Sequence, residues 1–173
     1  MLRHVAFLRA INTPPRHVKM EVVRGSFERL GLERVVTYIA SGNVIFETSA
    51  TAGLAGSIER ALEEDLGFSV PVYLRSGREV VAVADRRPFG ELSTAAEISF
   101  LPARPDPAAV RSLLATVTGD DRLAVIDREV HWYHPGRRDE SSHNEATVVR
   151  ILGMVTTQRS ARTVIAIADR FLR

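Results

Sequence analysis

The fold is decided by residues 35–48, which read Val-Val-Thr-Tyr-Ile-Ala-Ser-Gly-Asn-Val-Ile-Phe-Glu-Thr. Two runs rich in β-branched and aromatic residues, 35–39 and 43–48, flank a polar turn around Ser41-Gly-Asn43, and this pattern is typical of a β-hairpin. A hairpin that follows a strand and a helix in the chain indicates an α+β protein.

Further elements lie on both sides of the hairpin. Residues 4–9 are predicted to form a buried strand, and apolar residues at helical spacing over 18–30 predict a helix that Gly31 ends. After the hairpin, the pattern predicts a helix over 52–66 and a strand over 70–74. The resulting order, β-α-β-β-α-β, is that of a ferredoxin-like unit.

The rest of the chain has a related but less regular pattern. It contains a linking helix after Ser76, a strand, a helix capped by Asp106, a tight hairpin, and a helix opened by a capping box over 142–145. A last helix is predicted over 158–172. We therefore expect two α+β halves packed together, with boundaries that follow from these elements: a ferredoxin-like half over residues 1–75 and a related half, compatible with internal duplication, over residues 76–173.

Composition restricts the class of protein. The chain has 173 residues, of which 45% are hydrophobic and 25% charged, with a net charge of +2 and no cysteine. This length supports a sizeable core, and the lack of cysteine excludes disulfides, thiolate metal sites and cysteine nucleophiles. No window reaches the roughly 18 apolar residues of a membrane span, and the first residues lack the features of a signal peptide. We expect a cytoplasmic protein with no membrane contact.

The predicted topology brings two polar segments together. The first two strands are parallel and the third returns, so the loop after the first strand lies at the same end of the sheet as the hairpin turn. These segments hold the candidate ligand-binding residues, which are Arg9, Asn12, Arg16, Lys19, Ser41 and Asn43. Arginine binds phosphate and carboxylate groups through paired hydrogen bonds, so this loop end is predicted to bind a small anionic or phosphorylated ligand.

A purely structural role accounts for some of the same residues. Ser41-Gly-Asn43 can serve the hairpin turn itself, and Asn12 can hold loop backbone. The two interpretations remain open at this stage.

Other chemistry has little support in the sequence. The phosphate-loop and dinucleotide motifs are absent, as is the Gly-x-Ser-x-Gly elbow, so no cofactor is predicted and no catalytic acid, base or nucleophile is assigned. His131 and His134 lie three apart on a predicted strand and point to opposite faces, so no metal site is predicted. Whether the protein is an enzyme stays open.

The alternative is a nucleic-acid-binding or protein-binding module that uses the basic N-terminal face. RNA-recognition domains share the β-α-β-β-α-β order and stack bases on aromatic residues of the first and third strands. The matching strands here offer Phe7 and Phe46, which fit a core role better. Nucleic acid is therefore the less favoured ligand, and nothing in the sequence indicates the oligomeric state or a protein-binding edge.

Three segments resemble a known bacterial family. They read Val-Ala-Phe-Leu-Arg-Ala-Ile-Asn over 5–12, Val-Lys-Met over 18–20 and Val-Thr-Tyr-Ile-Ala-Ser-Gly-Asn-Val-Ile-Phe over 36–46. They are similar in order and spacing to family 1697 of domains of unknown function, whose hairpin reads Thr-Tyr-Ile-Gln-Ser-Gly-Asn-Val-Val-Phe. The resemblance spans residues 4–74 and continues more weakly to the C-terminus. It implies a ferredoxin-like α+β fold and no known activity.

The chain departs from the family pattern in two places. Pro14-Pro15 stand where the family has two glycines, and prolines lack the amide hydrogens of an anion-binding nest. The family's later patterns, Gly-Arg-Ser-Lys-Leu and Thr-Arg-Asn-Trp-Asn-Thr, are reduced to Ser141, Arg159 and Thr163. A site that relatives build from the missing residues would be lost or changed here.

Overall fold

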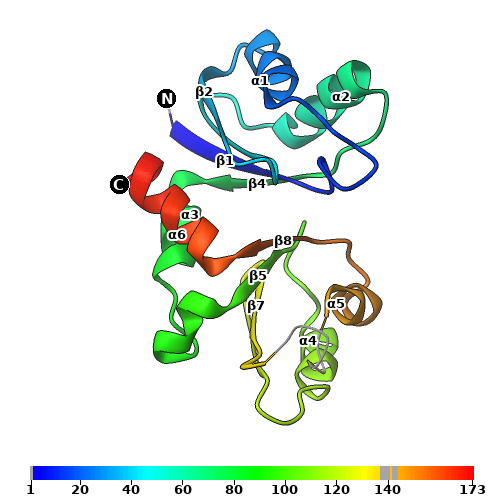
Figure 1. Ribbon diagram of the computed structural model, residues 1–173, viewed down its shortest axis with the longest axis vertical. Coiled ribbons are helices and arrows are strands. Elements are labelled where there is room, and N and C mark those ends of the chain that lie inside the picture. The colour runs from blue at the N-terminus through cyan, green and yellow to red at the C-terminus, as the bar shows by residue number, and fades with distance from the viewer. Residues whose placement is uncertain (1, 137–140, 142–143) are drawn as a thin grey trace. The chain divides into compact units, whose positions relative to one another are not determined.

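The computed structural model describes residues 2–136, 141 and 144–173 (Figure 1). The chain divides into two compact units: unit 1 is Met1–Val81 with Ile167–Arg173, and unit 2 is Ala82–Ala166. Each unit contains one four-stranded antiparallel sheet. The α+β class with two ferredoxin-like halves is therefore confirmed.

Unit 1 has the predicted element order. Its elements are β1 (Leu2–Leu8), α1 (Met20–Arg29), β2 (Glu33–Tyr38), β3 (Asn43–Thr48), α2 (Leu54–Leu66) and β4 (Val72–Ser76). The strands lie in the order β2-β3-β1-β4, and each is antiparallel to its neighbours. The hairpin strand β3 has the bounds that the sequence predicts, and β1 runs parallel to β2.

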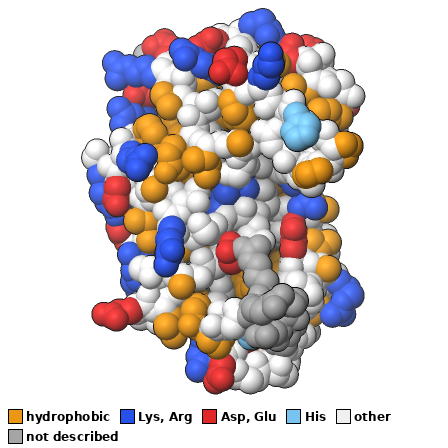
Figure 2. All heavy atoms as spheres, viewed as in Figure 1, with side chains coloured by type: hydrophobic (Ala, Val, Ile, Leu, Met, Phe, Trp, Pro, Cys, Tyr) orange, Lys and Arg blue, Asp and Glu red, His pale blue; other side chains and the backbone are white. Residues whose placement is uncertain are grey.

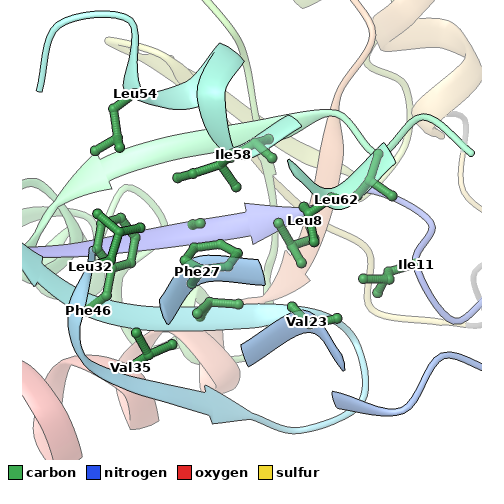
Figure 3. Packing of buried hydrophobic residues seen from close by; sticks show 14 residues of the cluster. Leu8, Ile11, Val23, Phe27, Leu32, Val35, Phe46, Leu54, Ile58 and Leu62 are labelled. Atoms are coloured by element: carbon green, nitrogen blue, oxygen red, sulfur yellow. The ribbon is translucent and has the colours of Figure 1, made fainter. Parts of the chain in front are cut away.

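The core of unit 1 lies between one face of this sheet and helices α1 and α2, as Figure 3 shows. Phe46 of β3 meets Phe27 of α1 edge-on, with ring centroids 5.4 Å apart. Ile58 and Leu62, one turn apart on α2, are both fully buried because residues four apart share a helix face. The apolar spacing used to predict both helices is thus the spacing of their buried faces.

Unit 2 repeats this arrangement. Its elements, together with the helix that precedes them, are α3 (Gly77–Asp85), the 3-10 helix η1 (Gly90–Ala95), β5 (Glu97–Phe100), α4 (Pro107–Leu114), β6 (Arg122–Ile126), β7 (Glu129–Tyr133), α5 (Glu145–Leu152), β8 (Thr157–Ser160) and α6 (Ala161–Ile167). The sheet order is β6-β7-β5-β8. Helices α4 and α5 cover one face of it and enclose a smaller core with Val130 of β7.

The helix predicted over 158–172 is wrong in its first turn. Residues 157–160 form β8, which pairs antiparallel with β5 and places Arg159 opposite Ile98. Helix α6 begins only at Ala161, where the Ser160 hydroxyl accepts the backbone N–H of Thr163 at 3.2 Å. A strand of four residues is too short to show a periodic pattern of apolar residues. It forms because it pairs with β5, which lies about 60 residues earlier in the chain. With β8, unit 2 has the order β-α-β-β-α-β instead of β-α-β-β-α-α.

The helix caps of unit 2 follow ordinary rules. The Asp106 carboxylate accepts the N–H groups of Ala108 and Ala109 at 2.8 and 3.1 Å, as predicted for the start of α4. At α5 the cap is Asn144, whose Oδ1 accepts the N–H of Thr147 at 2.9 Å. The predicted capping residue Ser142 lies outside the described residues.

The last residues of the chain belong to unit 1. The π-helical turn η3 (Ala168–Leu172) follows α6 directly. Phe171 of this turn lies edge-on to Tyr38 of β2 at a ring-centroid distance of 5.6 Å, and Arg3 of β1 donates to the carbonyl oxygen of Phe171. The strand register places Tyr38 and Arg3 on the face opposite to the core residue Phe46, so this segment covers part of the face that α1 and α2 leave open.

Among the described residues, no helix is long and apolar enough to cross a membrane.

Candidate functional site

The loop after β1 meets the hairpin turn between β2 and β3 at one end of the unit 1 sheet. The backbone N–H of Leu8 donates to the carbonyl oxygen of Gly42 at 2.8 Å, and Asn12 Nδ2 donates to the carbonyl oxygen of Ala40 at 2.9 Å. The structure therefore brings together the two segments that hold Arg9, Asn12, Arg16, Lys19, Ser41 and Asn43.

A glycine in the turn makes this approach possible. Gly42 has a φ of +81°, a value that residues with a Cβ atom rarely adopt. A Cβ atom at this position would lie 2.7 Å from Ile11 Cγ2 and 3.0 Å from Leu8 Cβ. The turn thus packs its backbone directly on the buried start of the loop.

The Asn12 side chain hydrogen-bonds both to the hairpin turn and to its own loop. Besides its bond to Ala40, its Oδ1 accepts the backbone N–H of Val18 at 2.7 Å, so one side chain closes the loop on itself and ties it to the turn. The Asn12 Nδ2 also lies 3.8 Å from the sulfur of Met20, at the start of α1. Asn12 is a positioning residue for the loop backbone.

Asn43 and Ser41 organise the turn. Asn43 is fully buried, and its Nδ2 donates to the carbonyl oxygen of Tyr38 at 2.9 Å and to the Ser41 hydroxyl at 3.1 Å. These bonds join the two strand ends across the turn, which is the structural role that the sequence left open. Ser41 itself is exposed.

The cationic side chains of the loop have different surroundings. Arg16 is exposed, and its guanidinium lies 4.1 Å from the centroid of the Phe68 ring, with Nη1 3.5 Å from the carbonyl oxygen of Ala10. Lys19 is exposed immediately before α1, and Arg9 is half-buried at the end of β1. An arginine that is stacked on an aromatic face keeps its N–H edge available to an anion.

The loop end thus carries cationic side chains on a backbone that Asn12 holds in place. Among the residues that the structure describes, no group of three or more His, Asp or Glu side chains is placed to hold a metal ion. The site is therefore best described as a set of cations on a braced loop.

Sequence reasoning missed a cavity at the other end of the same sheet. It has a volume of about 270 Å³ and is bordered by Arg3, Arg34 and Arg170, with Glu47 between them. No motif marks it, because its residues come from β1, from the start of β2, from the end of β3 and from η3.

Ser141, one of the residues retained from the family's later pattern, contacts a buried carboxylate of unit 2. The Ser141 hydroxyl donates to Asp121 Oδ2 at 2.9 Å, and His134 Nδ1 contacts the other oxygen of the same carboxylate. The serine and the histidine thus contact the same carboxylate, whereas in a serine–histidine–aspartate relay the histidine lies between the other two groups. The remaining residues of the pattern over 139–143 lie outside the described residues.

Two basic side chains of unit 2 are deeply buried. Arg159 of β8 is 7% exposed, and burial lowers the pKa of its guanidinium to about 10. His131 of β7 is 2% exposed. Burial, assisted by the positive charge of Arg86, lowers the pKa of His131 to about 4, and its Nε2 has no hydrogen-bond partner among the described residues.

We expect His131 to make stability depend on pH. The unfolded chain binds this proton with an ordinary pKa of 6.5, whereas the folded protein binds it only near pH 4. The neutral ring is therefore compatible with folding above pH 6.5, and stability falls as pH decreases from 6.5 to 4. Urea unfolding at pH 7 and pH 5 should show that wild type loses about 2 kcal/mol more than His131→Leu. Equal losses would contradict this assignment.

Comparison with known proteins supports the fold and the family. The structure is similar to that of conserved bacterial protein SP0830 from Streptococcus pneumoniae, with a TM-score of 0.79 at 21% identity, over 100% of this chain and 99% of that one. At this identity the likeness shows the fold alone. A search of curated proteins finds no match.

The family assignment rests on the sequence itself. The model of the family described as "Protein of unknown function (DUF1697)" matches residues 1–131. This range includes the whole strand–loop–helix–hairpin region that carries the resemblance, and it extends beyond β6 into β7. The chain therefore belongs to the DUF1697 family.

Proposed function

We propose that the loop end of unit 1 binds a small anionic or phosphorylated ligand. Arg9, Arg16 and Lys19 supply the positive charge, while Asn12, Ser41 and Asn43 hold the two segments in place. The observation that carries the proposal is the brace itself: Asn12 bonds both to the loop and to the turn, at 2.7 and 2.9 Å. A site whose backbone is ordered before binding loses less conformational entropy when the ligand arrives.

Arg16 has few competing partners among the residues that the structure describes. Arg16 is stacked on Phe68 and makes one long contact with a backbone oxygen. By contrast, Arg24 on α1 is paired with Glu28 at 2.7 Å. An incoming anion would therefore meet unneutralised charge at Arg16, but a neutralised pair at Arg24.

Thermal and urea unfolding against nucleotides, sugar phosphates and carboxylates test the proposal. One ligand class is expected to stabilise wild type, by about 2.7 kcal/mol at 100 times its dissociation constant. The Arg9→Ala/Arg16→Ala double variant is expected to lose this response while remaining folded. Arg24→Ala is the matched control and should keep the response. If no class stabilises wild type, or if the double variant responds equally, the loop end is not the binding site.

The same panel decides the nucleic-acid alternative. A nucleic-acid module predicts binding of short oligonucleotides with an affinity that falls steeply with salt. Phe7 and Phe46 are fully buried, so these two rings are not available to stack on bases. This burial argues against the nucleic-acid alternative. Figure 2 shows basic side chains interspersed with acidic ones on the face that it draws.

A further inference from the structure

The arginine-lined cavity of unit 1 is separate from the loop end. It lies beside the face of the sheet that η3 covers, and its lining residues are Arg3, Arg34, Val36, Ile45, Phe46, Glu47, Arg170 and Phe171. The three arginines exceed the single glutamate by two positive charges. A volume of about 270 Å³ is slightly below the range of pockets for drug-sized ligands, so the cavity suits a small molecule.

One of the three arginines, Arg3, uses its guanidinium to hold elements of unit 1 together. Arg3 Nε donates to Glu47 Oε1 at 3.0 Å, and its Nη1 donates to the carbonyl oxygen of Phe171. Arg3 therefore joins β3 to η3 and lines the cavity. It also neutralises the charge of Glu47, which would otherwise repel an anion.

The other two arginines have unused hydrogen-bonding capacity. Arg34 meets Glu47 only through Nη1 at 3.5 Å, and its side chain is 72% exposed. The guanidinium of Arg170 lies 5.5 Å from the Tyr38 ring centroid, and it has no hydrogen-bond acceptor within the described part of the chain. Each guanidinium keeps the edge that pairs with an oxyanion through two hydrogen bonds.

The backbone at Arg34 is held in an unusual conformation. Its φ is +50°, a left-handed value that is uncommon for a residue with a side chain. It lies in an irregularity of the β2–β3 pairing, between Glu33 and Val36. Bulges of this kind redirect a side chain out of the strand alternation and are frequent beside binding sites, and here the bulged residue lines the cavity.

We propose that this cavity binds a small ligand that carries a carboxylate or phosphate group on a compact apolar body. Arg34 and Arg170 hold the oxyanion from two sides, β2 and η3. The apolar lining of Val36, Ile45 and Phe171 receives the body of the ligand. The site does not depend on the proposed function of the loop end, with which it shares no residue.

Titration with benzoate and phenyl phosphate, with benzamide as the neutral counterpart, tests this site. Binding is measured by calorimetry and by shifts of the assigned backbone amide signals of Arg34, Tyr38 and Phe171. One or both anions should bind wild type with those signals shifting, while benzamide should not. The Arg34→Gln/Arg170→Gln variant should bind at least tenfold more weakly. Its own amide spectrum reports whether it is folded.

Two further variants test whether the anion binds in this cavity and not elsewhere on the protein. Arg60→Gln removes a cation of α2 whose side chain hydrogen-bonds to Ser57 at 3.1 Å and does not line the cavity, and this variant should bind as wild type does. The Arg9→Ala/Arg16→Ala variant of the loop end should also retain cavity binding. The proposal is overturned if neither anion binds wild type below 10 mM, roughly −2.7 kcal/mol on the standard scale. It is equally overturned if the cavity variant binds undiminished, or if binding is lost only in the loop-end variant.

Discussion

Gly42→Ala is expected to lower the free energy of unfolding by about 2–5 kcal/mol. An alanine held at the φ of +81° found here costs roughly 1–2 kcal/mol in backbone strain. Its Cβ would lie 2.7 Å from Ile11 Cγ2 and 3.0 Å from Leu8 Cβ, and relieving such an overlap in a packed core costs about 1–3 kcal/mol more. Urea unfolding of the variant beside wild type measures the sum.

Gly53 provides the matched control. It also has a left-handed backbone, with a φ of +65°, but a Cβ there would meet nothing within 4 Å. Gly53→Ala should therefore show the backbone cost alone, about 1–2 kcal/mol. If the two alanine variants lose the same stability, the close packing of the turn on the loop contributes nothing to the fold.

Arg86→Ala should destabilise the protein by about 3–5 kcal/mol. Arg86 Nη1 donates to Glu129 Oε2 at 2.6 Å, and the Glu129 side chain is only 3% exposed. Removing one member of a buried ion pair leaves the other charge in a medium that solvates it poorly. The substitution also removes a positive charge that lowers the pKa of His131, so the acid sensitivity of that residue should become weaker.

Arg104 tests whether burial is the cause. It pairs with Asp127 at 2.8 Å, but its side chain is 78% exposed, and exposed pairs contribute about 0–1 kcal/mol. Arg104→Ala should therefore be nearly neutral. A second test is Arg86→Ala combined with Glu129→Gln, which removes the buried negative charge and should recover part of the loss. Equal effects of Arg86→Ala and Arg104→Ala would refute the role of burial.

The elements predicted best are those whose cause is local. The hairpin strand β3 has its predicted bounds because Val44, Ile45 and Phe46 favour a pleated, buried strand and Gly42 ends the preceding turn. The meeting of loop and turn was also predictable, because it follows from the β-α-β-β order alone. The sequence alone could not show which of these polar side chains bind backbone groups. Asn12, for example, donates to the carbonyl oxygen of Ala40, which is 28 residues away in the chain and becomes a neighbour only when the protein folds.

The features missed are those whose cause is distant. Strand β8 depends on its ladder with β5 and not on the four residues Thr-Gln-Arg-Ser that form it. The arginine-lined cavity joins residues from both ends of the chain, so no spacing rule could have grouped Arg34 with Arg170. A count of charged residues also overestimates the free positive charge of the N-terminal segment. Arg24 and Arg29 of this segment are paired with Glu28 and Asp65.

The assignment of residues 167–173 to unit 1 has a consequence for biosynthesis. The ribosome completes β1 to β4 early, but the segment that contacts Tyr38 and Arg3 is translated only after the whole of unit 2. The first sheet therefore leaves the exit tunnel with part of one face uncovered. The strands of this sheet are made first, but their contacts with residues 167–173 form last. A nascent chain stalled within unit 2 would therefore expose a part of the first sheet that the finished protein covers.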